Sequence, residues 1–181
     1  ILVGINEDAF ATTTISSNAS CTTNAASPLI QILEEAVGIE KAVLSTVHGY
    51  TASQNLVDGP VKHAKYKDDF RDGRAGAHNI VPSSTGAAIA VTKAIPSLQN
   101  KFDGISLRVP IIAGSIADVT FIAKKNTSVE EINTALKKAA ASERWKPVFS
   151  VTDEPLVSSD IVGSPFASIA DLSLTRVVDG N

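Results

Sequence analysis

Hydrophobic residues in the first part of the chain repeat with two different periods. Between Thr22 and Val37 apolar side chains recur every three or four residues and Gly38 follows, which predicts an amphipathic helix that ends at the glycine. Pro28 lies within this segment and predicts either a kink or a helix that settles only after the proline. Lys41 to His48 reads instead as a strand, with Val43, Ser45 and Val47 on one face, Leu44, Thr46 and His48 on the other, and His48 at its C-terminal end.

The rest of the chain shows further changes of period. The stretch from Gly49 to Ile80 contains Gly, Pro, Asp and Lys throughout and has no sustained period, so we expect a long loop there, either ordered or mobile. The same criteria predict the following elements: a buried strand at Ile1–Ile5, a helix at Ala87–Ile95 capped by Ser84 or Thr85, strands within Phe102–Lys125, a helix opened by the capping box Ser128–Glu131, and strands within Val148–Val178.

Strands and helices that follow one another without regular alternation indicate an α+β fold, with helices packed on one face of a mixed or antiparallel sheet. With 181 residues, 44% of them hydrophobic, the chain can bury a sizeable core, so we expect a single domain over residues 1–181. The chain contains no methionine, begins inside a predicted strand and stops at the turn signal Asp179-Gly180-Asn181. We therefore expect it to be a piece of a longer protein.

Composition narrows the classes of function. The formal net charge is −3 with both signs interspersed, which disfavours a nucleic-acid or membrane-surface partner and favours small-molecule chemistry. No apolar run approaches the ~20 residues that span a bilayer, and no targeting segment is visible, so we expect a cytoplasmic protein. One cysteine excludes an intrachain disulfide, and one cysteine with three scattered histidines offers no usual metal-ligand spacing, so we expect no metal.

The single cysteine, Cys21, is a candidate nucleophile. It lies at the start of the first predicted helix, where the positive end of the helix and a nearby imidazolium favour a thiolate. A helix and a strand separate it from His48, so the two side chains can return to the same end of the fold, where His48 would act as acid or base. The plainer alternatives are an inert core cysteine and a hydrogen-bonded strand-end histidine. His63 and His78 lie in loop-like sequence and are expected to be surface residues.

Anion-binding features accompany this pair. The predicted helix starts at Ser20–Thr23 and Ser84–Gly86 offer unpaired backbone N–H groups that favour an anion. Candidate phosphate ligands are Arg71, Arg108 and the hydroxyl of Thr51. Arg108 lies within an apolar strand and should therefore have a partner. No GxGxxG or P-loop sequence is present, so any nucleotide site in this chain would be partial.

Five motifs in a fixed order resemble the phosphorylating glyceraldehyde-3-phosphate dehydrogenase family. They are Ser17-Asn18-Ala19-Ser20-Cys21-Thr22-Thr23-Asn24, Val47-His48-Gly49-Tyr50-Thr51, Arg71-Asp72-Gly73-Arg74, Ser84-Thr85-Gly86-Ala87-Ala88 and Leu107-Arg108-Val109-Pro110. The resemblance implies that Cys21 attacks the aldehyde of glyceraldehyde 3-phosphate to form a hemithioacetal. Hydride then passes to NAD to leave a thioester, and inorganic phosphate releases 1,3-bisphosphoglycerate.

The resemblance also implies a role for each matching residue. His48 activates the thiol and assists the hydride step, and Asn24 supports the cysteine motif. The phosphate assignments are Thr51 and Arg108 for the substrate's phosphate, Ser20, Thr22, Thr85 and Gly86 for inorganic phosphate, and Arg71 for an arginine associated with both sites.

The chain resembles the family's catalytic domain without its N-terminal Rossmann domain and without its closing strand and helix. Those parts carry most of the NAD site, so we expect the chain alone to be inactive, and NADP stays open as the cofactor. The resemblance implies a homotetramer at full length.

Three departures and two alternatives accompany the resemblance. Ala25 and Ile89 stand where many members have a second cysteine and a lysine, and residues 63–69 look expanded, which bears on the placement of Arg71. The alternative enzyme is erythrose 4-phosphate dehydrogenase, whose substrate is one carbon longer. The alternative of another class is a non-catalytic, self-associating module.

Overall fold

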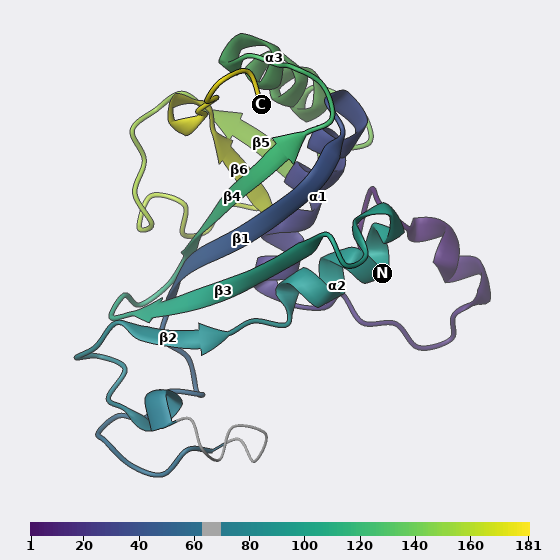
Figure 1. The fold of residues 1–181 in the computed structure, drawn as a ribbon. Helices are drawn as coiled ribbons and strands as arrows, with labels where there is room; N and C mark the ends of the chain where they lie inside the picture. Colours follow the sequence, from purple (N-terminus) through teal and green to yellow (C-terminus); the bar gives the residue numbers. More distant parts are fainter. Residues whose placement is uncertain (63–69) are drawn as a thin grey trace.

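The computed structural model describes residues 1–62 and 70–181 and contains one main sheet (Figure 1). Its strands are β1 (Ile39–Gly49), β2 (Val81–Ser84), β3 (Phe102–Val109) and β4 (Ser115–Ala123). They lie in the order β2-β3-β1-β4, with β1 parallel to β3 and the other neighbours antiparallel. The sheet is therefore mixed.

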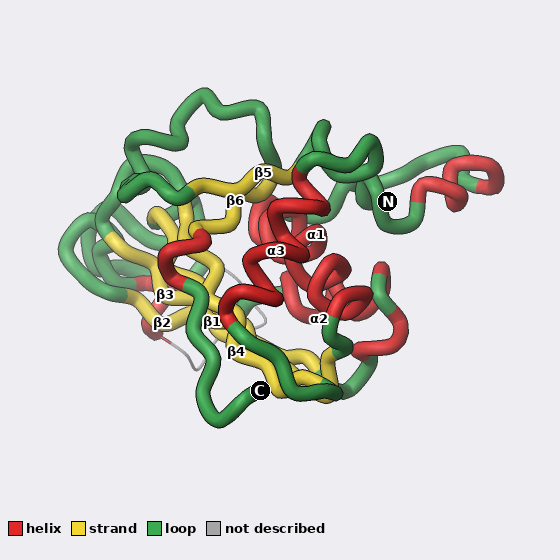
Figure 2. Tube along the Cα trace, turned by 90° about the horizontal axis from the view of Figure 1, so that it is seen from above, coloured by secondary structure: helices red, strands yellow, loops and turns green. Residues whose placement is uncertain are grey.

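The helices cover one face of this sheet (Figure 2). They are α1 (Cys21–Ala36), α2 (Ala87–Ala94) and α3 (Val129–Ala140). Their apolar sides meet the sheet in a core whose fully buried members include Ile30, Leu44 and Phe149. A smaller parallel sheet joins β5 (Phe149–Thr152) to β6 (Ser168–Asp171). Four short 3-10 helices complete the described elements: Glu7–Thr12, Phe70–Gly73, Pro96–Leu98 and Leu172–Leu174. The predicted α+β fold with helices on one face of a mixed sheet is confirmed.

Local signals at both ends define α1. The hydroxyl of Ser20 accepts the N–H of Thr23 at 3.1 Å, which caps the first turn. At the other end Gly38 adopts φ +71° and donates its N–H to the carbonyl of Leu33 at 3.2 Å. The alternative prediction, of a helix formed only after Pro28, is wrong, because α1 begins at Cys21 behind the cap at Ser20 and contains the proline.

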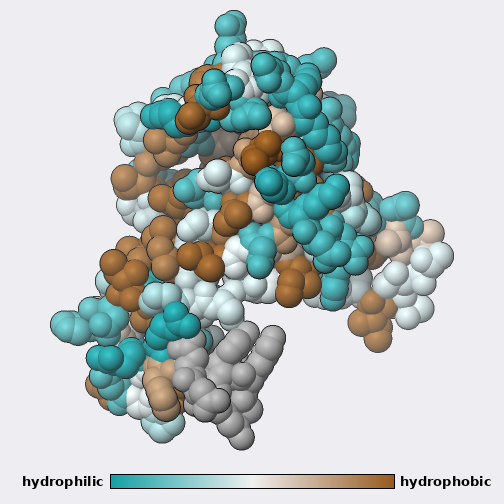
Figure 3. Space-filling model, viewed as in Figure 1, coloured by the Kyte–Doolittle hydropathy of each residue, from teal (hydrophilic) through white to brown (hydrophobic). Residues whose placement is uncertain are grey.

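The alternation in β1 separates two environments. Leu44 and Thr46 are fully buried on the helix side, whereas Val43 is 57% exposed on the opposite side. Exposed apolar side chains on the neighbouring strands share that opposite side, which we call the open face: Val43, Val47, Ile105, Ile116 and Ile122. In the view of Figure 3 apolar groups lie across the middle of the molecule between polar ones.

Two sequence predictions need correction: the strand at Ile1–Ile5 and the capping residue of α2. Residues 1–5 form turns rather than a strand, because Gly4 adopts φ +77° and the N–H of Leu2 bonds the side chain of Asn6. At α2 the capping residue is Gly86, without a side-chain cap, and Ser84 instead ends β2. The Thr85 hydroxyl does accept the N–H of Ala87 at 3.1 Å. Strands within 148–178 are limited to β5 and β6.

The long loop between β1 and β2 is held by its own hydrogen bonds where it is described. The side-chain amide of Asn55 donates to the carbonyls of Pro60 and Gly73, both at 3.0 Å, and Lys62 donates to the carbonyl of Ala52. His78 is exposed, as predicted. The predictions for His63 and for an expansion at 63–69 lie outside the described residues. No helix in the described ranges is long and apolar enough to cross a membrane.

Candidate active site

Cys21 and His48 face each other across the start of α1 and the end of β1. The Cys21 Sγ lies 3.4 Å from the His48 Nε2, and the thiol is exposed. The other ring nitrogen of His48, Nδ1, lies 2.6 Å from the carbonyl oxygen of Gly49. Because a carbonyl only accepts, Nδ1 carries a proton, and Nε2 is the nitrogen left to exchange a proton with sulfur. The pair can therefore form a thiolate and an imidazolium.

The pair opens into a pocket of about 380 Å³. Its walls come from the start of α1, the start of α2 and the C-terminal ends of β1 and β3. The lining residues are Ala19, Ser20, Cys21, Thr22, Thr23, His48, Thr51, Ser84, Thr85, Gly86, Ala87, Ala90 and Arg108. The structure thus brings together eight of the nine residues predicted for the site, and Arg71 is the exception.

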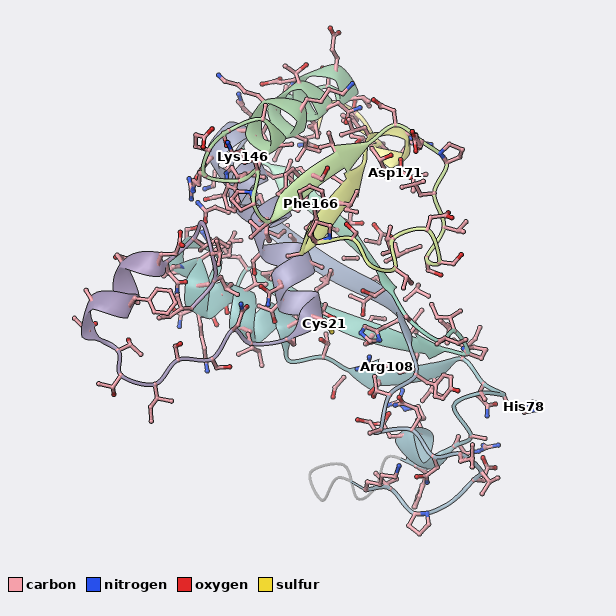
Figure 4. The ribbon with its side chains drawn as sticks, turned by 180° about the vertical axis from the view of Figure 1, so that it is seen from behind. Cys21, His78, Arg108, Lys146, Phe166 and Asp171 are labelled. Carbon is pink, nitrogen blue, oxygen red and sulfur yellow. The ribbon has the colours of Figure 1, made fainter. Side chains whose placement is uncertain are left out.

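Arg108 is held beside His48 by the register of the sheet. The two residues are partners in the parallel β1–β3 ladder, so their side chains leave the sheet on the same face. Figure 4 shows Arg108 on the same side of the molecule as Cys21. Among the described residues, the buried Nε of Arg108 has no hydrogen-bond partner. The expected partner within the chain is therefore not found for this atom, and an anion in the pocket could supply it.

Hydroxyl groups line the rest of the pocket. The hydrogen bonds that hold them were not predicted from the sequence. The Ser20 and Thr23 hydroxyls lie 2.8 Å apart, and Thr23 is buried. Thr51 donates its N–H to the side-chain oxygen of Gln54 at 3.0 Å. Gln54 in turn donates to the buried carboxylate of Asp72 at 2.9 Å. The sequence does not indicate that Asp72 is buried, because a carboxylate between two arginines usually lies in solvent.

Arg71 stands apart from this pocket, and the described residues form neither a metal site nor a dinucleotide-binding turn. Arg71 lies in the short 3-10 helix Phe70–Gly73, is exposed, and does not line the pocket. The described residues contain no group of three metal-ligating side chains. Nor do they contain a strand that leads through a glycine-rich turn into a helix, since β1 runs into the long loop and the turn from β2 into α2 has one glycine, Gly86. They therefore do not fit a dinucleotide such as NAD.

Comparisons with known proteins agree with this arrangement. Residues 20–181 match the family model of the glyceraldehyde 3-phosphate dehydrogenase C-terminal domain. A glyceraldehyde-3-phosphate dehydrogenase of Mycobacterium avium is 48% identical over 180 residues, which are 99% of this chain and 51% of that protein. One of Clostridium pasteurianum is 45% identical over 174 residues, 96% of this chain and 49% of that protein. The chain thus spans about half the length of the curated relatives it matches. The chain belongs to the glyceraldehyde 3-phosphate dehydrogenase family, and its match is to the C-terminal domain.

Proposed function

We propose that this chain is the catalytic domain of an enzyme that oxidises and phosphorylates glyceraldehyde 3-phosphate. The observation that carries the proposal is the 3.4 Å approach of Cys21 to His48 at a pocket that Arg108 and several hydroxyl groups also line. Both groups are in hydrogen-bond reach, which a cysteine nucleophile with a histidine base requires. An inert core cysteine is inconsistent with the exposure of Cys21.

The chemistry available to this domain begins with attack on the aldehyde. His48 Nε2 takes the thiol proton while its Nδ1–H stays hydrogen-bonded to the Gly49 carbonyl. The Cys21 sulfur then bonds to the aldehyde carbon, the C=O π bond breaks, and the oxygen receives the proton back from His48 Nε2 to complete a hemithioacetal. This step needs no residue outside the chain.

Two anions must lie near the same sulfur in a phosphorylating oxidation, one on the substrate and one that attacks the thioester. We assign the substrate's phosphate to Thr51 and Arg108. The assignment for inorganic phosphate is Ser20, Thr22, Thr85 and Gly86. The pocket supports both assignments because all six residues line it. Arg71 does not line the pocket, so the pocket gives no support to its assignment as an arginine associated with both phosphate sites.

The hydride acceptor is assigned to NAD by family membership alone. Because the described residues do not fit a dinucleotide, we derive no step through NAD, and we propose that residues 1–181 alone do not reduce it. Family membership also underlies the proposal that the longer protein is a cytoplasmic homotetramer, and the exposed apolar side chains of the open face are compatible with an interface.

The test of the thiol pair uses alkylation of residues 1–181 by iodoacetamide across pH. We expect Cys21 to react at lower pH than a cysteine in a short peptide, and His48→Ala to move the profile to higher pH. The matched control is His78→Ala, which removes an exposed histidine away from the pocket. A wild-type profile identical to that of the peptide would refute the proposed nucleophile.

The test of the substrate uses the longer protein. Steady-state rates with glyceraldehyde 3-phosphate and with erythrose 4-phosphate should favour the shorter aldehyde, and a preference for the erythrose substrate overturns the assignment. NADH formation by residues 1–181 alone should be absent, and turnover there would contradict the proposed division of the cofactor site.

A further inference from the structure

The turn that leads into Cys21 contains a residue in an unfavourable backbone conformation. Ala19 adopts φ +60°, two positions before the cysteine. For alanine the left-handed conformation is disfavoured by a factor of roughly 5 to 30 in population. The turn therefore needs contacts that hold it.

One side chain, that of Asn24, spans this turn from the first turns of α1. Its amide nitrogen Nδ2 lies 2.7 Å from the carbonyl oxygen of Asn18 and 3.0 Å from that of Ser20. These carbonyls stand on the two sides of Ala19. Because both only accept hydrogen bonds, the amide nitrogen and not its oxygen must face them. Both N–H bonds of the amide thus hold the backbone around Ala19.

A second contact acts on Ala19 itself. The hydroxyl oxygen of Ser17 accepts the N–H of Ala19 at 3.1 Å. Immediately after the turn, Ser20 caps α1 and Cys21 occupies its first position. A change of the Ala19 backbone would therefore move the cap and the thiol together, away from His48 on a different element.

We propose that Asn24 is a positioning residue for Cys21. Its amide holds the left-handed turn at Ala19, and the turn holds the thiol within reach of His48. The proposal rests on the proposed function, because it concerns the reactivity of Cys21 as a nucleophile.

A role in helix stability alone predicts different behaviour. Alanine forms helices better than asparagine, so Asn24→Ala should leave α1 intact. If the side chain mattered only for the helix, the reactivity of the thiol would stay the same or follow thermal stability. Positioning instead predicts slower alkylation without loss of helix.

The experiment measures the second-order rate constant of iodoacetamide with residues 1–181 and its pH profile. We expect Asn24→Ala to lower the rate constant by about five- to thirtyfold, because alanine without these contacts leaves the left-handed conformation by about that factor. We also expect its pH profile to move toward that of a peptide thiol. Ser17→Ala, in the segment before the helix, should lower the rate constant as well, by a smaller factor.

The decisive measurement is whether a glycine at position 19 restores the alkylation rate. Glycine adopts positive φ as readily as negative φ, so Ala19→Gly in the Asn24→Ala background should restore the rate to within about twofold of wild type. The matched control is Gln31→Ala, which removes the 2.7 Å hydrogen bond from Gln31 to Glu35 in α1, away from the pocket, and should not alter the rate.

Each outcome decides a separate claim. An Asn24→Ala variant that reacts like wild type overturns the proposal, and so does a slow variant that Ala19→Gly does not restore. Should Asn24→Ala fail to fold by circular dichroism, Ser17→Ala with and without Ala19→Gly gives the same comparison. A wild-type thiol with the reactivity of a peptide thiol contradicts the proposed function instead, so the two failures are distinguishable.

Discussion

The buried carboxylate of Asp72 should stabilise the loop that carries Thr51, and its removal gives a quantitative test. Asp72 is 9% exposed and Gln54 is 4% exposed. One carboxylate oxygen accepts the Gln54 amide at 2.9 Å and the other accepts the Ser83 hydroxyl at 3.3 Å. Asp72→Ala removes both carboxylate oxygens. The buried side-chain N–H of Gln54 then loses the oxygen to which it donates.

The magnitude follows from these contacts. A hydrogen bond to an ionised acceptor contributes about 1.5–3 kcal/mol, and the bond of 3.3 Å lies at the weaker end. An unpaired buried amide costs about 1–3 kcal/mol, whereas loss of the buried charge itself is favourable. We expect Asp72→Ala to lower the free energy of unfolding by about 2–4 kcal/mol. Asp72→Asn, which keeps the size and one acceptor, should cost about 1 kcal/mol.

Urea unfolding followed by the fluorescence of Trp145, the single tryptophan, measures the effect. At an m-value of about 2 kcal/mol per molar urea, Asp72→Ala should lower the midpoint by about 1–2 M. Local opening of the loop would not change the fluorescence of Trp145. Limited proteolysis between β1 and β2 is therefore the second measurement. The matched control is Asp118→Ala, because Asp118 is exposed on β4.

The same variant should weaken anion binding. Gln54 also accepts the N–H of Thr51 at 3.0 Å and its hydroxyl at 3.4 Å, so a displaced Gln54 frees Thr51. Protection of Cys21 from iodoacetamide by inorganic phosphate should then require a higher phosphate concentration. A midpoint and a proteolysis rate within error of wild type would refute the stabilising role of Asp72.

Three further predictions concern the scaffold. Gly104→Ala should destabilise the sheet by about 1–3 kcal/mol in urea unfolding, because a Cβ there would lie 2.5 Å from the carbonyl oxygen of Leu44. A hydrogen bond from the backbone N–H of Ala75, and a second one from the side chain of Arg74, hold the pKa of Asp58 below its usual value of 3.8. The stabilisation by Asp58 is therefore complete above that pH and lost as pH falls through the folded pKa. The difference in unfolding free energy between wild type and Asp58→Asn should shrink below pH 3.8. Ser128→Ala removes the cap of α3 and should cost about 1 kcal/mol in the same assay.

Elements with strong local signals could be predicted from the sequence. The helix that begins at Cys21 has a capping serine and a terminal glycine, and the residues of β1 divide between two faces over most of the strand, so the sequence pattern located both. The apolar run at Ile1–Ile5 has the composition of a strand, but composition does not show whether a partner strand is available. Gly4 lies against the ring of Trp145, far along the chain, and turns the backbone there.

The parts of the site that could not be predicted depend on contacts between distant residues. The register that places Arg108 beside His48 is set by pairing of β1 with β3, which are separated by the long loop and α2. The burial of Asp72 likewise depends on Gln54 and Ser83 from other segments. The positive φ of Ala19 has no signal in residue type, since glycine is the usual residue in that conformation.

The location of the pocket follows from the direction of the elements that build it. β1 and β3 are parallel, so their C-terminal ends meet at one edge of the sheet, and that edge receives His48 and Arg108. The helices α1 and α2 begin at the same pocket, and a helix start carries partial positive charge with unpaired N–H groups. A guanidinium, an imidazole and two helix starts therefore line one pocket with the Cys21 thiol, which is the arrangement that the proposed function requires. Because these groups come from separate elements, a variant that loosens one connection, such as the Asn24 contacts, should reduce thiol reactivity while the fold persists.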